Sequence, residues 1–264
     1  MAANAAKVAL ITGGGSGMGL AVARHLASKG WRLSIADMNS ERGKSAAEET
    51  RGIFTRTDVT KYNDQATVFQ KTREAYGQID FVYANAGIVD TAPFYAPQAE
   101  LPPPPLPLLC QDVCLTGVVY ASYLAMHYMR QNPSKGGNII MTSSAAGIYA
   151  SPALPVYTGA KHGVVGFMRS LAPMLAKDNI RVNCTMPGAV RTNLCDEETW
   201  NAFPAEQFTK TSDIVSAIEK ILKDESITGK AVEISKDKIY FREQHEFCDE
   251  AQRQTMGAAG DGAF

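Results

Sequence analysis

The sequence predicts an α/β protein, namely one doubly wound domain in which a parallel sheet carries helices on both faces. Short runs rich in β-branched residues alternate with longer helical patterns, which is typical of strand–helix–strand units. A glycine-rich turn joins the first run to the first helical pattern. The length of 264 residues suits a single domain of this kind, so we assign residues 1–264 to one unit.

Seven parallel strands are expected, each a short apolar run bounded by Gly, Pro, Asn or charged residues. They are residues 7–12, 32–37, 53–56, 81–84, 138–142, 181–185 and 231–234. The helical patterns between them are long enough to cross over the sheet, and right-handed crossovers place helices on both faces. These patterns are residues 17–29, 40–49, 61–76, 108–130, 157–176 and 212–223.

Some segments interrupt this alternation. Residues 102–105 are consecutive prolines, which predict a rigid extended approach to the fourth helix or, as an alternative, a ligand for a proline-reading domain. Residues 193–211 are expected to form a substrate lid that carries Trp200, Phe203 and Phe208. The Gly- and Ala-rich residues 257–264 are expected to be a flexible tail.

The charge balance favours a small-molecule partner. Lys and Arg number 26 against 27 Asp and Glu, so the formal net charge of −1 gives no broad positive field for nucleic acid or anionic lipid. The chain shows neither a signal-peptide pattern nor a run that we interpret as membrane-spanning, so a cytoplasmic location is expected. The scattered cysteines and histidines lack the spacing of disulfide frameworks or metal sites, so no metal is expected.

A strand, a glycine turn and a helical pattern follow one another at the N-terminus. A pyrophosphate needs backbone that it can approach closely, free N–H groups and the positive end of a helix dipole. A tight strand–helix connection is the structural alternative, but the flanking strand and helix favour a dinucleotide site on a Rossmann-type domain. The predicted cofactor-binding residues of the turn are Thr12, Gly13, Gly15, Ser16, Gly17, Met18 and Gly19.

Asp37 ends the second expected strand, where a carboxylate can accept hydrogen bonds from the adenosine ribose hydroxyls. A 2′-phosphate would be repelled there. Met38 and Asn39 follow, so no Arg or Lys lies directly beside Asp37 in the sequence to neutralise a phosphate. The sequence therefore predicts NAD rather than NADP.

Tyr157 and Lys161 stand four residues apart at the start of a helical pattern, so their side chains share one face of the helix. An ammonium beside a phenol stabilises the phenolate and lowers the phenol pKa from about 10 toward neutrality, which makes it a usable acid or base. Ser143 and Ser144 end the preceding strand, where a hydroxyl could bond the reacting oxygen.

Residues 7–234 resemble the short-chain dehydrogenase/reductase family. The motifs that carry the resemblance are T-G-x-x-x-G-x-G, the strand-end Asp, N-A-G at 85–87, S-A-A-G at 144–147, Y-x-x-x-K at 157–161 and P-G at 187–188. The resemblance implies that Tyr157 is the acid/base, that Lys161 lowers its pKa and holds the nicotinamide ribose, and that Ser144 orients the substrate oxygen. Ser143 is then a bystander.

The same resemblance implies the remaining cofactor contacts. Asp58 and Val59 would face the adenine, and Val190 and Thr192 would contact the carboxamide. Residues 156–167 and 227–240 look most like NAD-linked 15-hydroxyprostaglandin dehydrogenases. The other implied cofactor-binding residues are Asn85, Ala86, Gly87, Pro187 and Gly188.

The fourth helix departs from the family pattern. The family has V-N-x-x-G, in which the Asn helps to hold a water that relays protons to the active-site Lys, whereas residues 113–117 read Val-Cys-Leu-Thr-Gly. A thiol is a weak donor and a weak acceptor, so Cys114 cannot replace an amide and proton relay is in doubt. A role for Cys114 as redox sensor or nucleophile has no support in the sequence, which shows no cation and base arranged around it.

These observations predict NAD-linked interconversion of a secondary alcohol and a ketone on a fairly apolar small molecule. A redox-neutral cyclase or isomerase on the same scaffold stays open because of Cys114. A non-catalytic NAD-binding protein is a further alternative, against which Ser144, Tyr157 and Lys161 argue together. A homodimer or homotetramer is expected through residues 108–130 and 163–176, which are apolar on more than one helix face.

Overall fold

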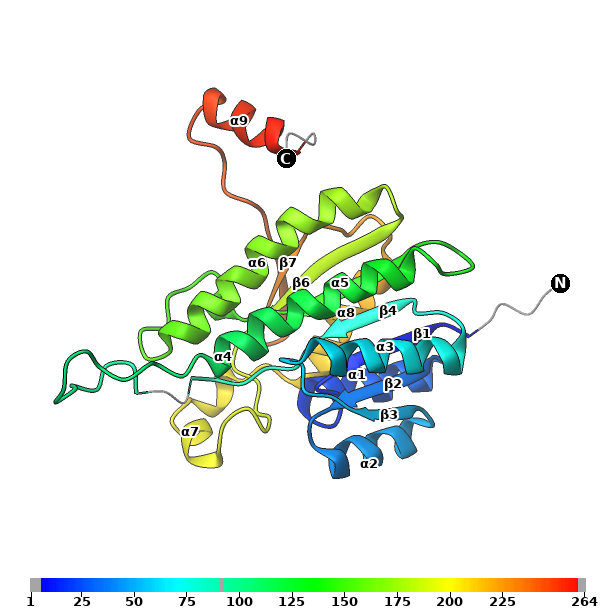
Figure 1. Cartoon of the computed structure of the whole chain (residues 1–264), viewed down its shortest axis with the longest axis horizontal. Coiled ribbons are helices and arrows are strands. Elements are labelled where there is room, and N and C mark those ends of the chain that lie inside the picture. Colours follow the sequence, from blue (N-terminus) through cyan, green and yellow to red (C-terminus); the bar gives the residue numbers. More distant parts are fainter. Residues whose placement is uncertain (1–5, 91–92, 261–264) are drawn as a thin grey trace.

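A computed structural model of the chain describes residues 6–90 and 93–260. Its strands form one eight-stranded sheet in the order β3-β2-β1-β4-β5-β6-β7-β8 (Figure 1). Strands β1 to β7 are parallel, and the chain order reverses direction between β1 and β4, as in doubly wound folds. The parallel strands are β1 (Val8–Thr12), β2 (Arg32–Asp37), β3 (Ile53–Arg56), β4 (Phe81–Ala84), β5 (Gly137–Thr142), β6 (Ile180–Pro187) and β7 (Ala231–Ser235).

The eighth strand corrects the expected seven-stranded parallel sheet. β8 (Lys238–Arg242) pairs antiparallel with β7, with Ser235 opposite Lys238. Lys236 has a φ of 54°, the left-handed conformation that a tight hairpin requires. The β-branched and aromatic run Ile-Tyr-Phe between Lys238 and Arg242 was the available signal for this edge strand.

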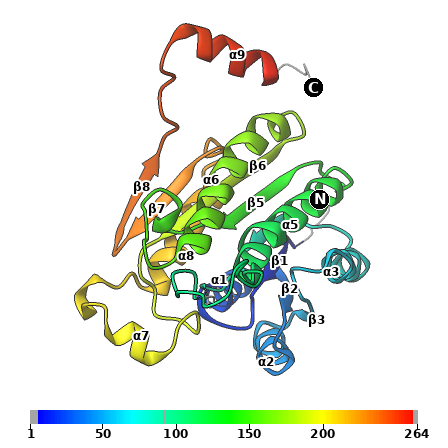
Figure 2. The same ribbon diagram turned by 60° about the vertical axis from the view of Figure 1, so that its left-hand side comes forward.

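Helices cover both faces of the sheet, as the sequence predicts (Figure 2). On one face the helices are α1 (Gly17–Ser28), α2 (Ser40–Thr50) and α8 (Thr211–Lys223). On the other face they are α3 (Tyr62–Tyr76), α5 (Gly117–Met129) and α6 (Pro155–Ala176). The remaining helical segments are α4 (Leu109–Gln111), α7 (Glu197–Asn201), α9 (Glu250–Gly260) and the 3₁₀ turns Ala145–Gly147 and Ala205–Gln207.

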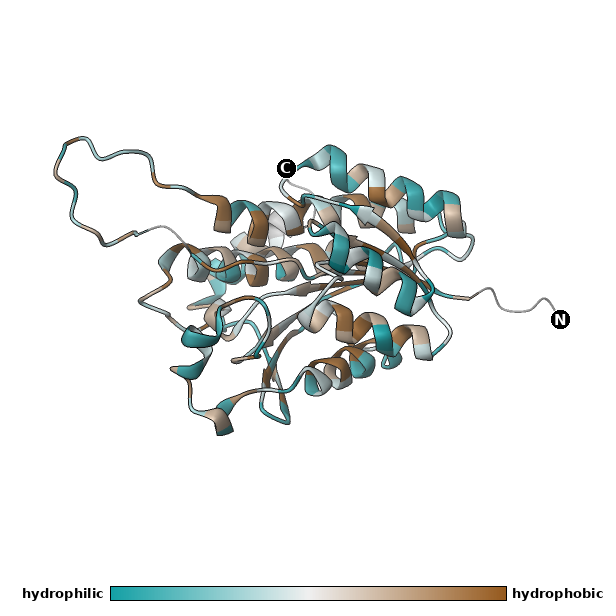
Figure 3. Cartoon of the chain, turned by 90° about the horizontal axis from the view of Figure 1, so that it is seen from below, coloured by the Kyte–Doolittle hydropathy of each residue, from teal (hydrophilic) through white to brown (hydrophobic). Residues whose placement is uncertain are grey.

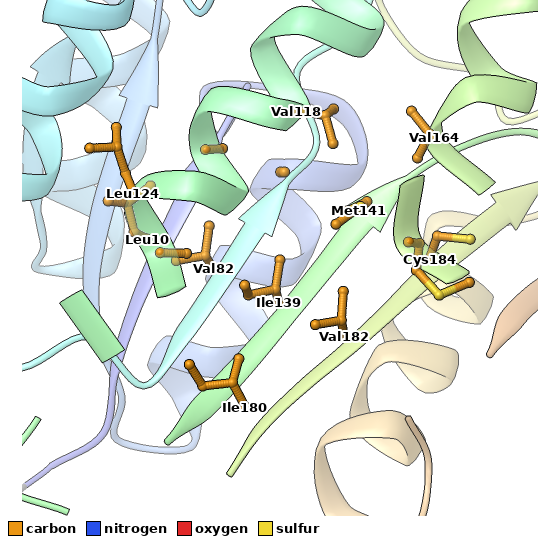
Figure 4. Close-up of a cluster of buried hydrophobic side chains, with 14 of the residues drawn as sticks. Leu10, Val82, Val118, Leu124, Ile139, Met141, Val164, Ile180, Val182 and Cys184 are labelled. Atoms are coloured by element: carbon orange, nitrogen blue, oxygen red, sulfur yellow. The ribbon is translucent and has the colours of Figure 1, made fainter. Parts of the chain in front are cut away.

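Two hydrophobic layers hold the helices to the sheet because successive strand residues point to opposite faces. In β5, Ile139 and Met141 join the layer under α3, α5 and α6, whereas Ile140 joins the layer under α1 and α8. Figure 4 shows the first layer, in which Leu10 and Val82 of the sheet lie close to Leu124 of α5. Hydrophobic residues accordingly concentrate in the strands (Figure 3). Both layers leave the carboxyl ends of the strands free to form a site.

The fourth expected helix, residues 108–130, is not one regular α-helix. A π-helical turn, Asp112–Thr116, separates α4 from α5. Such turns occur frequently at functional sites. The turn contains Cys114, the residue at which the chain departs from the family pattern.

The combined stretch Leu109–Met129 is also long and apolar enough to cross a membrane by length and composition alone, with a mean hydropathy of 1.3. The sequence interpretation had found no such run. Val118, Leu124 and Met129 are buried against the sheet, and this packing accounts for their apolar character. A core helix passes the same test, so the finding is weak evidence for a membrane-spanning helix.

The irregular segments differ from expectation in part. Residues 93–108, which include the prolines, project from the body of the molecule (Figure 1). Residues 250–260 form α9, which stands apart beyond α6, so residues 257–260 of the expected flexible tail are helical and residues 261–264 lie outside the described residues. The expected lid, residues 193–211, contains α7 and one 3₁₀ turn.

Candidate active site

A cavity of about 350 Å³ lies at the carboxyl ends of the parallel strands. Asp37 lines it together with Tyr157 and Trp200. Ligands of doubly wound sheets bind at this edge, where the strand order reverses. Most of the predicted site residues lie on its wall: Gly13, Ser16, Gly17, Met18, Asp37, Asp58, Val59, Asn85, Ala86, Gly87, Ser144, Tyr157, Lys161, Pro187, Gly188, Val190 and Thr192.

Thr12, Gly15 and Gly19 are predicted site residues that do not line this cavity. Each instead shapes its wall. Thr12 Oγ1 accepts a hydrogen bond from the backbone N–H of Asn85 at 3.0 Å. A β-carbon at Gly19 would collide with the carbonyl oxygen of Gly13, and Gly13 itself has a φ of 64°. The glycines therefore let the turn fold tightly against β4, which keeps backbone N–H groups at the start of α1 close to the cavity.

Asn85 ties the ends of three strands together. Its Nδ2 donates to the carbonyl oxygen of Thr12 at 3.1 Å, and its Oδ1 accepts from Thr142 Oγ1 at 3.2 Å. These contacts join β4 to β1 and β5. They fix the floor of the cavity between the glycine turn and Lys161.

Asp37 lies against the glycine turn. Its Oδ2 accepts a hydrogen bond from the Gly15 N–H at 2.9 Å, and its Oδ1 accepts from the Asn39 N–H at 2.9 Å. Arg42 in α2 also lines the cavity. The sequence interpretation missed Arg42 because it considered only the direct neighbours of Asp37, whereas the first turn of a helix returns a residue five positions later to the same site.

The described residues fit a dinucleotide. The turn is free of β-carbons where a pyrophosphate must approach, and a carboxylate at Asp37 suits ribose hydroxyls. A phenol and a primary amine lie elsewhere on the wall of the same cavity, at Tyr157 and Lys161. The cavity thus combines a nucleotide-binding region with an acid/base region.

Tyr157 and Lys161 share one face of α6, as the sequence predicts. Lys161 Nζ lies 5.4 Å from the centroid of the Tyr157 ring and donates a hydrogen bond to the carbonyl oxygen of Thr142 at 2.8 Å. Only 2% of Lys161 is exposed, so its charge acts in a poorly solvated place. Ser143 and Ser144 both line the cavity, and Ser143 Oγ also donates a hydrogen bond to the Lys161 carbonyl oxygen at 2.8 Å, which fixes α6.

Burial is the strongest influence on Tyr157. It raises the pKa of this phenol above its ordinary value, while the charge of Lys161 and a hydrogen bond with Ser144 act in the opposite direction. The net lowering toward neutrality that the sequence predicted is therefore not what the protein alone provides. Desolvation of a phenol that is 8% exposed exceeds the effect of its cation.

Asp90 is a site residue that the sequence interpretation missed. Its Oδ1 accepts a hydrogen bond from the Tyr157 N–H at 2.8 Å, and its Oδ2 accepts from the Val156 N–H at 3.0 Å. A carboxylate at a helix N-terminus satisfies free N–H groups and suits the helix dipole. Asp90 thus fixes the turn of α6 that carries Tyr157. No local pattern could reveal this contact, because the partners are more than sixty positions apart in the chain.

The expected lid closes one side of the cavity. Trp200 Nε1 donates to the Thr192 carbonyl oxygen at 2.8 Å, and only 5% of Trp200 is exposed. Its ring packs against Phe203 and Phe208, with centroids 5.8 and 5.9 Å apart. The aromatic residues therefore pack the lid on itself, and Trp200 also presents an apolar surface to the cavity.

The doubly wound sheet, glycine turn and cavity are the architecture of dinucleotide-binding proteins. Residues 7–201 match the family described as short chain dehydrogenase. The chain belongs to the short-chain dehydrogenase/reductase family, whose members are oxidoreductases that bind a nicotinamide cofactor.

Individual relatives agree with this assignment. The chain is 42% identical to the short-chain dehydrogenase/reductase prx7 of Penicillium rubens, over 91% of this chain and 95% of that protein. It is 36% identical to a 2,5-dichloro-2,5-cyclohexadiene-1,4-diol dehydrogenase of Sphingobium indicum, over 70% and 73%. A 3-ketoacyl-(acyl-carrier-protein) reductase of Brucella melitensis, complexed with NADH, superposes with a TM-score of 0.77 at 26% identity, covering 88% of this chain and 97% of that one.

Proposed function

We propose that this oxidoreductase uses NAD to interconvert a secondary alcohol and a ketone on a fairly apolar small molecule. The observation that carries the proposal is the set formed by Ser144, Tyr157 and Lys161 on the wall of the cavity that Asp37 also lines. A phenol with a buried cation beside it is a group that can move a proton, and the family supplies the nicotinamide.

Asp37 supports NAD over NADP. Its carboxylate lies against the glycine turn, where it would accept hydrogen bonds from ribose hydroxyls and repel a 2′-phosphate. Arg42 acts in the opposite direction because it lines the same cavity and could neutralise a phosphate. We favour NAD because Asp37 is fixed by two backbone N–H groups, and the related reductase of Brucella melitensis was solved with NADH.

The proposed chemistry assigns a task to each side chain. A bound nicotinamide supplies the hydride acceptor or donor. In the oxidative direction Ser144 Oγ hydrogen-bonds the substrate oxygen, and the Tyr157 phenolate accepts the proton of the substrate hydroxyl. Lys161 stabilises that phenolate by its charge, and Asp90 keeps Tyr157 in position through the backbone of α6.

Apolar side chains support the assignment of the substrate class. Ile88, Val113, Leu194 and Trp200 line the cavity together with Tyr157. Such a wall favours apolar substrate groups through burial of nonpolar surface. The likeness of residues 156–167 and 227–240 to 15-hydroxyprostaglandin dehydrogenases stays a prediction and would fit a substrate of this character.

Replacing Tyr157 by Phe tests the proposal. Removal of the proton-transfer group should lower kcat for alcohol oxidation by about 10²- to 10⁴-fold, with little change in NAD affinity. Activity is read by NADH absorbance over a panel of secondary alcohols, and NAD affinity by intrinsic fluorescence. Tyr240→Phe, on the partly exposed strand β8, is the matched control and should behave as wild type. Wild-type turnover by Tyr157→Phe, or product formation without any change in NADH, would favour the redox-neutral alternative.

We also propose a homodimer or homotetramer built from the α4–α5 stretch and α6. Tyr123 of α5 is 48% exposed and Met174 of α6 is 45% exposed, so these helices present apolar surface outside the core. Light scattering at micromolar concentration should give at least twice the chain mass of 28.4 kDa. A monomeric mass would contradict this proposal.

A further inference from the structure

Two cysteines lie side by side next to the acid/base residues. Cys110 of α4 and Cys114 of the π turn are free thiols, 5% and 0% exposed. Their Sγ atoms lie 3.4 and 3.2 Å from the same acceptor, the carbonyl oxygen of Ile88. The Ile88 N–H in turn donates to Cys114 Sγ at 3.4 Å. The two thiols therefore both contact the backbone of Ile88, which directly follows residues 85–87 on the wall of the cavity.

Cys114 also faces Lys161. A β-carbon placed on Gly87 would lie 3.6 Å from Cys114 Sγ and 3.6 Å from Lys161 Nζ, so thiol and ammonium flank the same point. Cys110 and Cys114 pack in one apolar cluster with Tyr157. The buried Cys114 thiol is thus adjacent to Lys161, the cation that lies beside the Tyr157 ring.

The charged and titratable groups around Cys114 come from every element packed against it. They are Cys110 from α4, Lys161 and Tyr157 from α6, and Asp90 from the segment after β4. The pKa of Cys114 is lowered to about 6 by a hydrogen bond from Cys110, by the charge of Lys161 and by the Ile88 N–H. Burial and the charge of Asp90 act in the opposite direction and raise this pKa. Cys114 and Asp90 together with burial raise the pKa of Cys110, so one thiol of the pair ionises and the other stays protonated.

A metal does not explain this arrangement. Within residues 6–90 and 93–260, no group of three or more His, Cys, Asp or Glu side chains is placed to hold a metal ion. The neighbours of the pair are a lysine and a phenol, which exchange protons. This favours an acid/base role for the thiols.

We propose that Cys114, supported by Cys110, is the proton-exchange partner of Lys161 during turnover. The proposal rests on the proposed alcohol oxidation. In that direction the Lys161 ammonium gives a proton to the Cys114 thiolate, and the resulting amine takes the proton that Tyr157 received from the substrate. Cys110 keeps its own proton throughout, and the proton on Cys114 leaves to water in the cavity that Gly87 and Lys161 line. Protons alone move, and the starting charges are restored. Because Cys114 acts through Lys161, it is a positioning residue rather than a catalytic one.

Titration of the thiolate tests the arrangement without turnover. Ultraviolet absorbance of wild type against pH, with the Cys114→Ser spectrum subtracted, should give a midpoint well below the ordinary thiol value of about 8.5. Lys161→Ala should raise that midpoint because it removes the nearby positive charge. A midpoint at or above the ordinary value in wild type would overturn the proposal, whatever reaction the enzyme catalyses.

Kinetics test the role. Cys114→Ala should lower kcat for alcohol oxidation at neutral pH by about tenfold, with KM and NAD affinity unchanged and with recovery at high pH, where hydroxide accepts the proton. Cys114→Ser should show the same defect in kcat, since a hydroxyl keeps the hydrogen bonds but does not ionise near neutrality. If the role of Cys114 were purely structural, Cys114→Ser would instead restore the wild-type kcat. Cys184→Ala is the matched control, because burial raises the pKa of that core thiol to about 12.

Cys114→Asn separates this proposal from the interpretation of Cys114 as a lost family amide. The thiol relay predicts a loss of turnover at neutral pH, and restoration of a family amide predicts a gain. A gain, or a pH profile of Cys114→Ala identical to wild type, would overturn the relay. Absence of alcohol oxidation in wild type would instead refute the proposed function, while the thiolate titration would still report on the Cys114–Lys161 pair.

Discussion

The dinucleotide side and the substrate side of the cavity are built in different ways. On the dinucleotide side, the glycine turn, Asp37 and the first turn of α1 lie within one strand–helix–strand unit. On the substrate side, Tyr157 depends on Asp90, and Lys161 on Thr142. Trp200 of the lid depends on Thr192. The glycine turn and Asp37 are thus neighbours within one unit, whereas Tyr157 and Lys161 contact segments that only the folded sheet brings together.

This difference indicates how each side should respond to substitution. Within a local unit, one β-carbon in the wrong place affects a defined turn and the affinity for the cofactor. Across the substrate side, the groups are electrostatically linked, because Lys161 influences both Tyr157 and Cys114. Changes there should appear in turnover and in its pH dependence rather than in cofactor affinity.

Gly19→Ala is expected to have the largest effect on the dinucleotide side. The added β-carbon would collide with the Gly13 carbonyl oxygen and push the turn away from the pyrophosphate position. Strain of about 1–3 kcal/mol should weaken NAD binding by about 10- to 100-fold. Fluorescence titration measures the affinity. Gly166→Ala in α6, where a β-carbon meets nothing within 4 Å, is the control and should bind NAD as wild type does. Equal NAD affinities of the two variants would show that the tight glycine turn does not determine cofactor binding, contrary to the proposed difference between the two sides of the cavity.

The pH dependence of turnover is the corresponding test on the substrate side. Burial raises the pKa of Tyr157, so the phenolate that accepts a proton is scarce at neutral pH in the free enzyme. Below that pKa, kcat/KM for alcohol oxidation should rise with pH by up to about tenfold per unit, whereas ketone reduction, which needs the neutral phenol, should stay level. NADH absorbance in both directions gives the profiles. Oxidation that is already level at neutral pH would show that Lys161 outweighs burial.

Asp37→Ala is expected to have the smallest effect, because Arg42 remains nearby. Loss of the carboxylate should weaken NAD binding and relieve repulsion of a 2′-phosphate, which narrows the preference for NAD by about tenfold. Titration with both dinucleotides measures the ratio, and Asp37→Ala combined with Arg42→Ala shows how much Arg42 contributes. Tighter binding of NADP than of NAD by wild type would refute the assignment of Asp37.

Much of the fold was accessible from the sequence. The short apolar runs identify β1 to β7, and the glycines identify the turn, because these signals depend on neighbouring residues only. β8 was missed although it contains the strand-forming run Ile-Tyr-Phe, since it is an exposed edge strand whose pairing depends on the hairpin at Lys236. The π turn was missed because residues 108–130 have a continuous helical pattern, and the local change in winding is a property of the packed helix.

The sequence by itself determined the class of fold, the dinucleotide turn, and the spacing that puts Tyr157 and Lys161 on one helix face. These follow from steric rules that act over a few residues. Only the tertiary structure decided that Asp90 caps α6, that burial dominates the pKa of Tyr157, and that Cys110 and Cys114 lie beside Lys161. Desolvation and charge interactions act through space, so they are defined only once distant segments have packed together.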